Sequence, residues 1–349
     1  GCDALLARGA LNVATACHAS GRLGDALAFY QRGERLARAS GEEDLVVMLD
    51  MNVAKLFAGC GAFERAEARA TRARVRAEER GLGFFAAALG SVLAEAAHGR
   101  GALHAARALY EASTAAFAEQ GALREASEDR IELAELALAE GHVQEAEELV
   151  AEVNQPGIDA ALSRRIVVAR AKLAEAAGRA DQALALLSPV LEDAEGDSDL
   201  RAQAAALASR LAADLGKPLE ARRHADRARA IWLALAQTLP DDLRDGYLAH
   251  PRRALAITPA PAPAHPEAAS AELLRLERLL AIYRELSSEE DPAALLQRAL
   301  ASAVVLASAE RGFILLAEPD GSFRLAEVHN IDEGALDPKA GRFSRQIAE

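Results

Sequence analysis

The residues that could carry chemistry in this chain are few and poorly spaced for it. The acidic run Asp193–Asp199 offers carboxylate oxygens, but it lacks the sixth-position glycine and twelfth-position glutamate of a helix-loop-helix calcium site. His18 and His98 precede matching glycines by three residues, yet a metal site needs a third convergent ligand. The chain also contains no GxxxxGK, HExxH or GxSxG motif. The sequence therefore predicts no catalytic residue, no metal site and no cofactor, and a segment that is not an enzyme.

Polar residues at repeated positions are better candidates for binding. Aligning the chain on its recurring glycines places one set of polar side chains on a common helical face: Asn12, Thr15, Asn52, Lys55, Glu95, Glu132, Glu135, Lys172 and Arg210. An asparagine amide there could both donate to and accept from the backbone of an extended peptide. The alternative is that these are solvated polar faces with no ligand.

Charge is unevenly distributed along that face. Glu95, Glu128, Glu132 and Glu135 form an acidic centre, with Lys55 on one side and Arg165, Lys172 and Arg210 on the other. Because complementary potentials govern orientation and association rate, we expect a bound peptide to carry a basic centre. Charge reversal at Glu132 and Glu135 is then expected to weaken binding.

The elements that must position this face are repeats. Glycines followed five residues later by alanine recur at intervals of 37 to 40 residues, in six copies: Gly21, Gly61, Gly101, Gly141, Gly178 and Gly216. Apolar residues return every three or four positions before each glycine, as in Leu5–Ser20, and after it, as in Asp25–Ser40. Glycine ends a helix and lets the chain turn back, and the alanine allows two helices to approach closely. Each unit is therefore predicted to be a helical hairpin.

The spacing resembles that of the tetratricopeptide repeat (TPR). The first copy has Gly21, Ala26, Tyr30 and Gly33, and the third has the corresponding Gly101, Ala106, Tyr110 and Ser113. The family's first-helix tryptophan is absent, and the period exceeds the common one of about 34 residues. The resemblance implies a mostly α fold: a solenoid of about six hairpins plus a capping helix over residues 1–250, with a concave groove that binds a protein or peptide.

Composition limits the other partners. The 349 residues are 51% hydrophobic and 4% aromatic and have a net charge of −13, so no basic stripe is available for phosphates and no direct nucleic-acid partner is expected. No apolar run approaches the roughly 18 residues of a membrane span, and the start has no signal pattern. The three cysteines, Cys2, Cys17 and Cys60, show no pairing pattern and are interpreted as core residues. We expect a cytoplasmic protein without a membrane partner, and the start at Gly1 suggests a piece of a longer chain.

The last hundred residues have a different pattern. A Pro/Ala-rich linker is expected at 251–267, because its prolines cannot continue a helix. A leucine stripe predicts a helix at 271–287 that either pairs with a second copy or docks on the domain that follows, with docking favoured. Asp291 and Pro292 predict the start of another helix that runs to about Ala307. Gly312–Ala317 and Phe323–His329 are predicted strands of a hairpin that turns at Pro319–Ser322.

This order of elements, with Glu310-Arg311-Gly312 before the first strand, resembles the start of a GAF domain over 268–349. The closer resemblance is to the GAF domains of bacterial sigma-54-dependent regulators, in which Phe343–Ile347 would begin the next helix. It implies an α/β sensory domain of which only the N-terminal portion is present, and a small-molecule effector for the completed domain.

Taken together, the two resemblances imply a non-catalytic interaction scaffold and coupling module of a bacterial signalling or transcriptional regulator. In a second interpretation the GAF-like part is the small-molecule switch and the repeats are a spacer, or the chain is the regulatory segment of a serine/threonine kinase. An enzymatic function would require a kinase or ATPase domain outside these residues.

Overall fold

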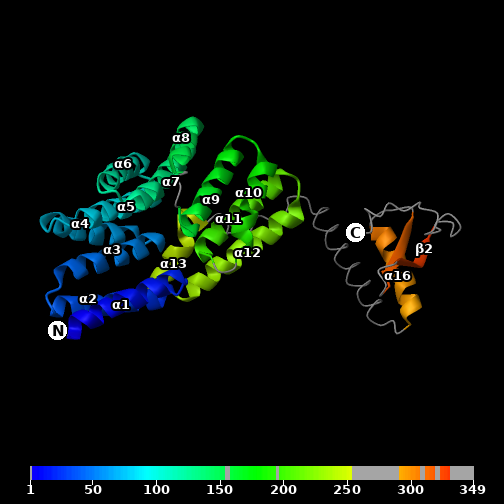
Figure 1. Cartoon of the computed structure of the whole chain (residues 1–349), viewed down its shortest axis with the longest axis horizontal. Helices are drawn as coiled ribbons and strands as arrows, with labels where there is room; N and C mark the ends of the chain where they lie inside the picture. Colours follow the sequence, from blue (N-terminus) through cyan, green and yellow to red (C-terminus); the bar gives the residue numbers. More distant parts are fainter. Residues whose placement is uncertain are drawn as a thin grey trace. The chain divides into compact units, whose positions relative to one another are not determined.

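The chain divides into two units, Gly1–Ala260 and Pro261–Glu349. The computed structural model describes residues 2–153, 158–193, 196–253, 291–306, 311–318 and 323–330 of them. The first unit is helical throughout its described elements and the second contains a helix and two strands (Figure 1).

Helices of the first unit follow one another as antiparallel hairpins. Six of them, α2 to α7, are 17 residues long and begin 20 residues apart, which is the spacing of the turn glycines. The helices are α1 (Cys2–Ala19), α2 (Leu23–Ala39), α3 (Glu43–Gly59), α4 (Phe63–Glu79), α5 (Gly83–Gly99), α6 (Leu103–Glu119), α7 (Leu123–Ala139), α8 (Val143–Val153), α9 (Ala160–Ala176), α10 (Ala180–Glu192), α11 (Ser198–Asp214), α12 (Pro218–Gln237) and α13 (Asp241–Ala249).

Glycine ends most of these helices. Gly21 has a φ of +75°, and the amide of Arg22 donates to the Cys17 carbonyl at 2.9 Å, which is the Schellman closure. The same arrangement recurs at both ends of the hairpins, so turn glycines lie every 20 residues from Gly21 to Gly141 and not only every 40. The helices α9 and α11, which follow longer connections, begin instead with aspartate side-chain caps, Asp159 and Asp197.

Small residues allow the helices of each hairpin to pack closely. The alanines five residues after the repeat glycines, Ala26, Ala66, Ala106, Ala146 and Ala183, are fully buried, as the sequence predicts. The first helices of successive hairpins also contact one another in an inner layer, α1 with α3, α3 with α5, α7 with α9 and α9 with α11. Because α3, α7 and α11 are contacted on several sides, each buries more residues than α4 or α6.

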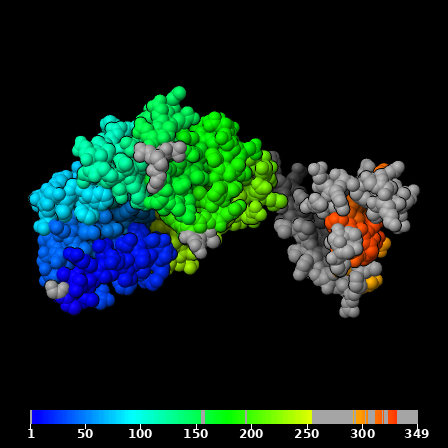
Figure 2. Space-filling model, viewed as in Figure 1, coloured from blue at the N-terminus to red at the C-terminus, as the bar shows by residue number. Residues whose placement is uncertain are grey.

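The two ends of the first unit contact each other. The Leu23 amide donates to Thr238 Oγ1 at 3.2 Å, and a Cβ on Gly61 would lie 2.4 Å from the Gly246 carbonyl oxygen. Arg65 forms an ion pair with Asp242 at 2.7 Å. Figure 2 shows the surface of the first hairpin adjoining that of the C-terminal helices of this unit. The repeats therefore close end to end, which the sequence does not predict.

Two expectations need correction in this unit. Cys17 and Cys60 are buried as core residues, but Cys2, the first residue of α1, is exposed. The predicted linker 251–267 begins too early, since Pro251–Arg253 are helical and pack on the repeats. The rest of that linker, the predicted helix at 271–287, the turn at Pro319–Ser322 and the helix start at Phe343–Ile347 lie outside the described residues.

In the second unit, α16 (Pro292–Leu306) packs on the antiparallel strands β1 (Gly312–Ala317) and β2 (Phe323–His329). These bounds agree with the sequence-based expectation for all three elements. Gly312 pairs with His329 and Ala317 with Phe323, with an irregularity between Ile314 and Leu315. A Cβ on Gly312 would lie 2.8 Å from Val304, so the glycine allows the strand to approach the helix.

Candidate functional site

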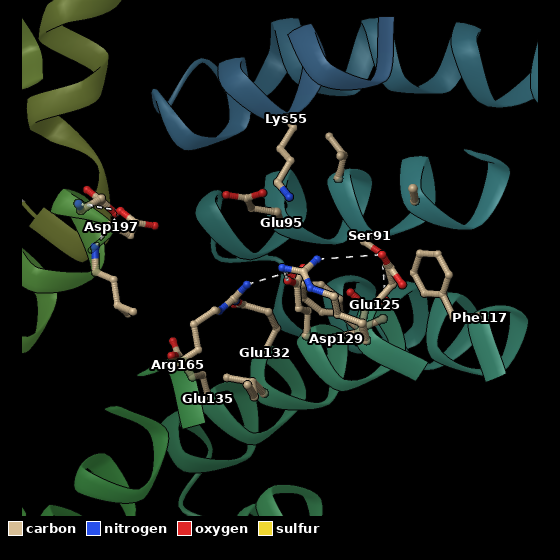
Figure 3. A pocket seen from close by; sticks show the side chains of 18 of the residues that line it. Lys55, Ser91, Glu95, Phe117, Glu125, Asp129, Glu132, Glu135, Arg165 and Asp197 are labelled. Carbon is tan, nitrogen blue, oxygen red and sulfur yellow. Dashed lines mark hydrogen bonds and ion pairs between the residues drawn. The ribbon is translucent and has the colours of Figure 1, made fainter. Parts of the chain in front are cut away.

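A cavity of about 400 Å³ opens on the inner layer of the first unit. Its walls come from α3, α5, α7, α9 and α11, which are the first helices of consecutive hairpins, together with residues of α6 and Arg252. The repeat therefore brings side chains more than 150 residues apart in sequence onto one concave face. Figure 3 shows how Lys55, Glu95, Glu132 and Arg165 face this space from different helices.

Carboxylates outnumber cations in the cavity lining. The acidic residues are Glu95, Glu125, Glu128, Asp129, Glu132, Glu135, Asp197 and Asp199, and the basic residues are Lys55, Arg124, Arg165 and Arg252. Apolar side chains, among them Phe84, Phe117 and Ile131, line one part of the wall. The cavity thus offers an acidic surface next to an apolar one, a combination that suits a basic segment with an apolar neighbour.

Glu132 and Glu135 each face cations on two sides. Oε1 of Glu132 lies 2.6 Å from Arg165 NH2, and Oε1 of Glu135 lies 2.6 Å from Lys172 Nζ. Oε2 of Glu132 accepts a hydrogen bond from Arg252, whose guanidinium also lies 3.8 Å from Oε2 of Glu135. Burial raises the pKa of Glu135, but the charges of Lys172 and Arg252 outweigh it and lower the pKa to about 2. Both carboxylates are therefore ionised and internally neutralised.

Glu95 differs from these two glutamates because it has no ion-pair or hydrogen-bond partner among the described residues. It is half-buried on α5, and burial raises its pKa against the opposing charge of Arg252. Lys55 on α3 lines the same cavity and forms no ion pair within 4 Å among the residues that the structure describes. A bound group could therefore contact the Glu95 carboxylate without first breaking a salt bridge.

Asp129 is the most deeply buried acid of the cavity, with 4% of its surface exposed. It accepts hydrogen bonds from Ser91 at 2.8 Å and from Ser113, but from no cation in the described part of the chain. Burial raises the pKa of Asp129 to about 7, although both serine hydroxyls oppose the rise. Near neutral pH this carboxyl exchanges between a charged and a neutral form.

The structure gathers some of the sequence-predicted residues and separates others. Asn52, Lys55, Glu95, Glu132 and Glu135 line the cavity, and Lys172 reaches it through Glu135. Asn12, Thr15 and Arg210 do not line it: Thr15 donates to the Leu11 carbonyl at 3.0 Å, and Arg210 pairs with Glu175 at 3.2 Å.

Asn12 and Asn52 share a repeat position but not an environment. Asn12 is exposed, whereas the Asn52 amide donates to the Met48 carbonyl at 2.8 Å and its oxygen lies 3.5 Å from the Tyr30 hydroxyl. Internal partners thus hold the Asn52 amide in place. The role of all nine residues in ligand binding stays a prediction.

Sequence reasoning missed the contribution of residues 250–253. Arg252 lines the cavity, and Arg253, 5% exposed, donates to Asp199 at 3.1 Å and to the Gly59 carbonyl at 2.8 Å. The Arg253 guanidinium also stacks on the Tyr247 ring at 3.8 Å. The sequence did contain a signal for this contact, because two adjacent arginines follow the short closing helix of a chain with an acidic repeat face. They lie next to proline-rich sequence, however, and that sequence indicates a linker.

The described residues contain no group of three or more histidine, cysteine, aspartate or glutamate side chains that could hold a metal ion. Within the same residues, every helix is too short or too polar to cross a bilayer.

No protein-family model and no curated protein matches this chain. Solved structures do match. A Rap conjugation gene regulator of plasmid pLS20, solved in complex with the Phr* peptide, has a TM-score of 0.53 and 14% identity over 73% of this chain and 76% of that one. A Rap protein complexed with competence and sporulation factor has a TM-score of 0.50 and 15% identity over 66% of this chain and 65% of that one. BtubC from P. vanneervenii has a TM-score of 0.44 and 20% identity over 62% of this chain and 92% of that one. The Rap structures show that the first unit has the repeated-hairpin fold of a TPR array.

Proposed function

We propose that the first unit is a non-catalytic interaction scaffold that binds an extended peptide segment with a basic centre in its concave groove. The observation that carries this proposal is the 400 Å³ cavity on the inner layer, in which eight acidic residues face four basic ones. A peptide side chain that brings a positive charge reduces this imbalance, while an acidic or neutral one does not.

The comparison with Rap supports a peptide as the class of ligand. The regulator with a TM-score of 0.53 was solved with the Phr* peptide, and its fold covers 73% of this chain. In this chain the first helices from α3 to α11 line one concave face. An extended peptide could lie across successive hairpins and make one set of contacts with each.

The wider role that fits this scaffold is a coupling module in a cytoplasmic bacterial signalling or transcriptional regulator. The order helix, strand, strand in α16, β1 and β2 supports a GAF-like second unit, in keeping with the sequence resemblance to sigma-54-dependent regulators. In this proposal the repeats bind a partner and the second unit binds a small-molecule effector.

The proposed function is tested by peptide selection on the full chain. Fluorescence anisotropy with a panel of unstructured peptides that differ only in the charge of one central residue should show tightest binding for arginine or lysine. Glu95→Gln should weaken that binding about tenfold, because Glu95 is a half-buried carboxylate of the cavity that forms no ion pair among the described residues. Glu111→Gln, on the exposed outer face of α6, is the matched control and should leave affinity unchanged.

Glu132 and Glu135 are less suitable for this test than the sequence suggests. Their substitution would also leave Arg165, Lys172 and Arg252 without partners, so a loss of binding could reflect a changed fold. If no peptide of the panel binds, or if acidic and basic peptides bind equally, the proposed function is wrong.

A further inference from the structure

The acidic centre of the groove is already occupied by the chain itself. Arg252 lies 120 residues from Glu132 in sequence, yet its guanidinium donates to Glu132 Oε2 and lies 3.8 Å from Oε2 of Glu135. These are the glutamates for which the sequence predicts an external basic partner. An internal arginine therefore occupies the place that the sequence predicts for a basic residue of the ligand.

The two adjacent arginines have different roles. Arg253 is held by the fold itself, through Asp199, the Gly59 carbonyl, the Tyr247 carbonyl at 3.2 Å and the Tyr247 ring. Arg252 has its described ion pairs with Glu132 and Glu135 alone and lines the cavity. Arg253 can therefore keep this segment in place while the Arg252 side chain leaves.

Glu132 and Glu135 would stay paired if Arg252 left. Each uses Oε1 for a cation of the groove wall, Arg165 or Lys172, both at 2.6 Å. Each directs Oε2 at Arg252. Removing Arg252 thus frees two carboxylate oxygens held by fixed neighbours, and a second guanidinium can take the place of the Arg252 nitrogen that faces both of them.

We propose that Oε2 of Glu132 and Oε2 of Glu135 form an arginine-binding site, which Arg252 fills in the unliganded chain and which an arginine of the bound peptide takes over. The inference rests on the proposed peptide-binding function and adds the identity of the basic residue and an internal competitor. Because the site must be vacated first, the apparent affinity for the peptide is the intrinsic affinity multiplied by the fraction of molecules in which Arg252 has left the site.

The test uses the chain's own segment as the probe. A synthetic peptide with the sequence of residues 246–256, and the same peptide with Arg252→Ala, are titrated into three full-length chains: the native chain, Arg252→Ala and Arg222→Ala. Arg222 is an exposed arginine of α12, with 71% of its side chain accessible, and serves as the control. The Arg252→Ala chain should bind the arginine peptide at least tenfold more tightly than the other two chains, and the alanine peptide should show no such gain.

Equal affinity of the native and Arg252→Ala chains for the arginine peptide would overturn the inference, as would failure of the Arg252→Ala chain to bind it. In either case, selection of basic peptides by the native chain would still support the proposed function. Side-chain NMR on the native chain covers the case in which Arg252→Ala does not fold. A saturating arginine peptide should shift the Nε–H resonance of Arg252 towards that of an exposed arginine such as Arg222, and an unchanged Arg252 resonance would contradict displacement.

Discussion

A buried carboxyl group without a cation makes Asp129 sensitive to pH. Two serine hydroxyls contact it, and burial raises its pKa from 3.8 to about 7. A carboxyl group with a raised pKa in the folded state favours folding only while it is protonated. The contribution of Asp129 to the unfolding free energy should therefore fall as the pH rises from about 4 through 7. Burial lowers the pKa of His18 to about 4 and of His250 to about 3, and these groups act in the opposite direction below about pH 6.5, so the contribution of Asp129 is measured as a difference between the native chain and a variant.

Asp129→Asn should remove this dependence. The amide keeps an oxygen for the hydroxyls of Ser91 and Ser113 but carries no charge. We expect the advantage of the variant over the native chain in unfolding free energy to grow by roughly 2–4 kcal/mol between pH 4 and pH 8, at about 1.4 kcal/mol per pKa unit. Urea unfolding at both pH values measures the difference. Parallel pH profiles of the two proteins would contradict this account of Asp129.

At the level of single residues, the sequence predicts the acidic surface but not its partners. Glu95, Glu132 and Glu135 are found by aligning copies, because the repeat places equivalent positions on one face. Arg252 cannot be found in that way, since it lies outside the repeat and reaches the cavity through a tertiary contact across 120 residues. The raised pKa of Asp129 depends on burial between helices, which a repeat alignment does not show.

At the level of elements, turn glycines are predictable from spacing, but their surroundings are not. Gly61 and Gly81 have nearly the same backbone, with φ of +73° and +68°. A Cβ on Gly61 would lie 2.4 Å from the Gly246 carbonyl oxygen, whereas a Cβ on Gly81 would meet nothing within 4 Å. The two positions look alike in sequence because the contact with Gly246 comes from the other end of the unit.

This pair separates backbone strain from tertiary contact. Gly81→Ala should lower the unfolding free energy by about 1–2 kcal/mol, the cost of a left-handed conformation for a residue with a Cβ. Gly61→Ala carries the same cost, and its Cβ also forces Gly246 to move. Its unfolding free energy should therefore be lower than that of Gly81→Ala by at least about 1 kcal/mol. Denaturant midpoints of the two variants and the native chain give the comparison. Equal losses would mean that the backbone approach of Gly61 to Gly246 contributes no stability.

For the first unit as a whole, end-to-end closure changes how the repeats support each other. In an open array each repeat contacts only its neighbours, so local damage spreads outwards along the sequence. Here the turn after α1 meets the end of α12, where Thr238 accepts a hydrogen bond from the Leu23 amide, and Arg253 bonds to the Gly59 carbonyl. A change that destabilises the first hairpin should therefore also destabilise the last one through their direct contact.

Two helical glycines test this coupling. A Cβ on Gly24 would lie 2.0 Å from the Thr238 carbonyl oxygen, while one on Gly9 meets nothing within 4 Å. Gly9→Ala should stabilise the protein by about 0.5–1 kcal/mol, because alanine restricts the unfolded chain and favours helix. Gly24→Ala gains the same propensity but separates the two ends, so hydrogen exchange should increase in α1 and α2 and also in α12 and α13. An increase confined to α1–α3 would show that the unit behaves as an open array, because in such an array a disturbance reaches α12 only through every hairpin between.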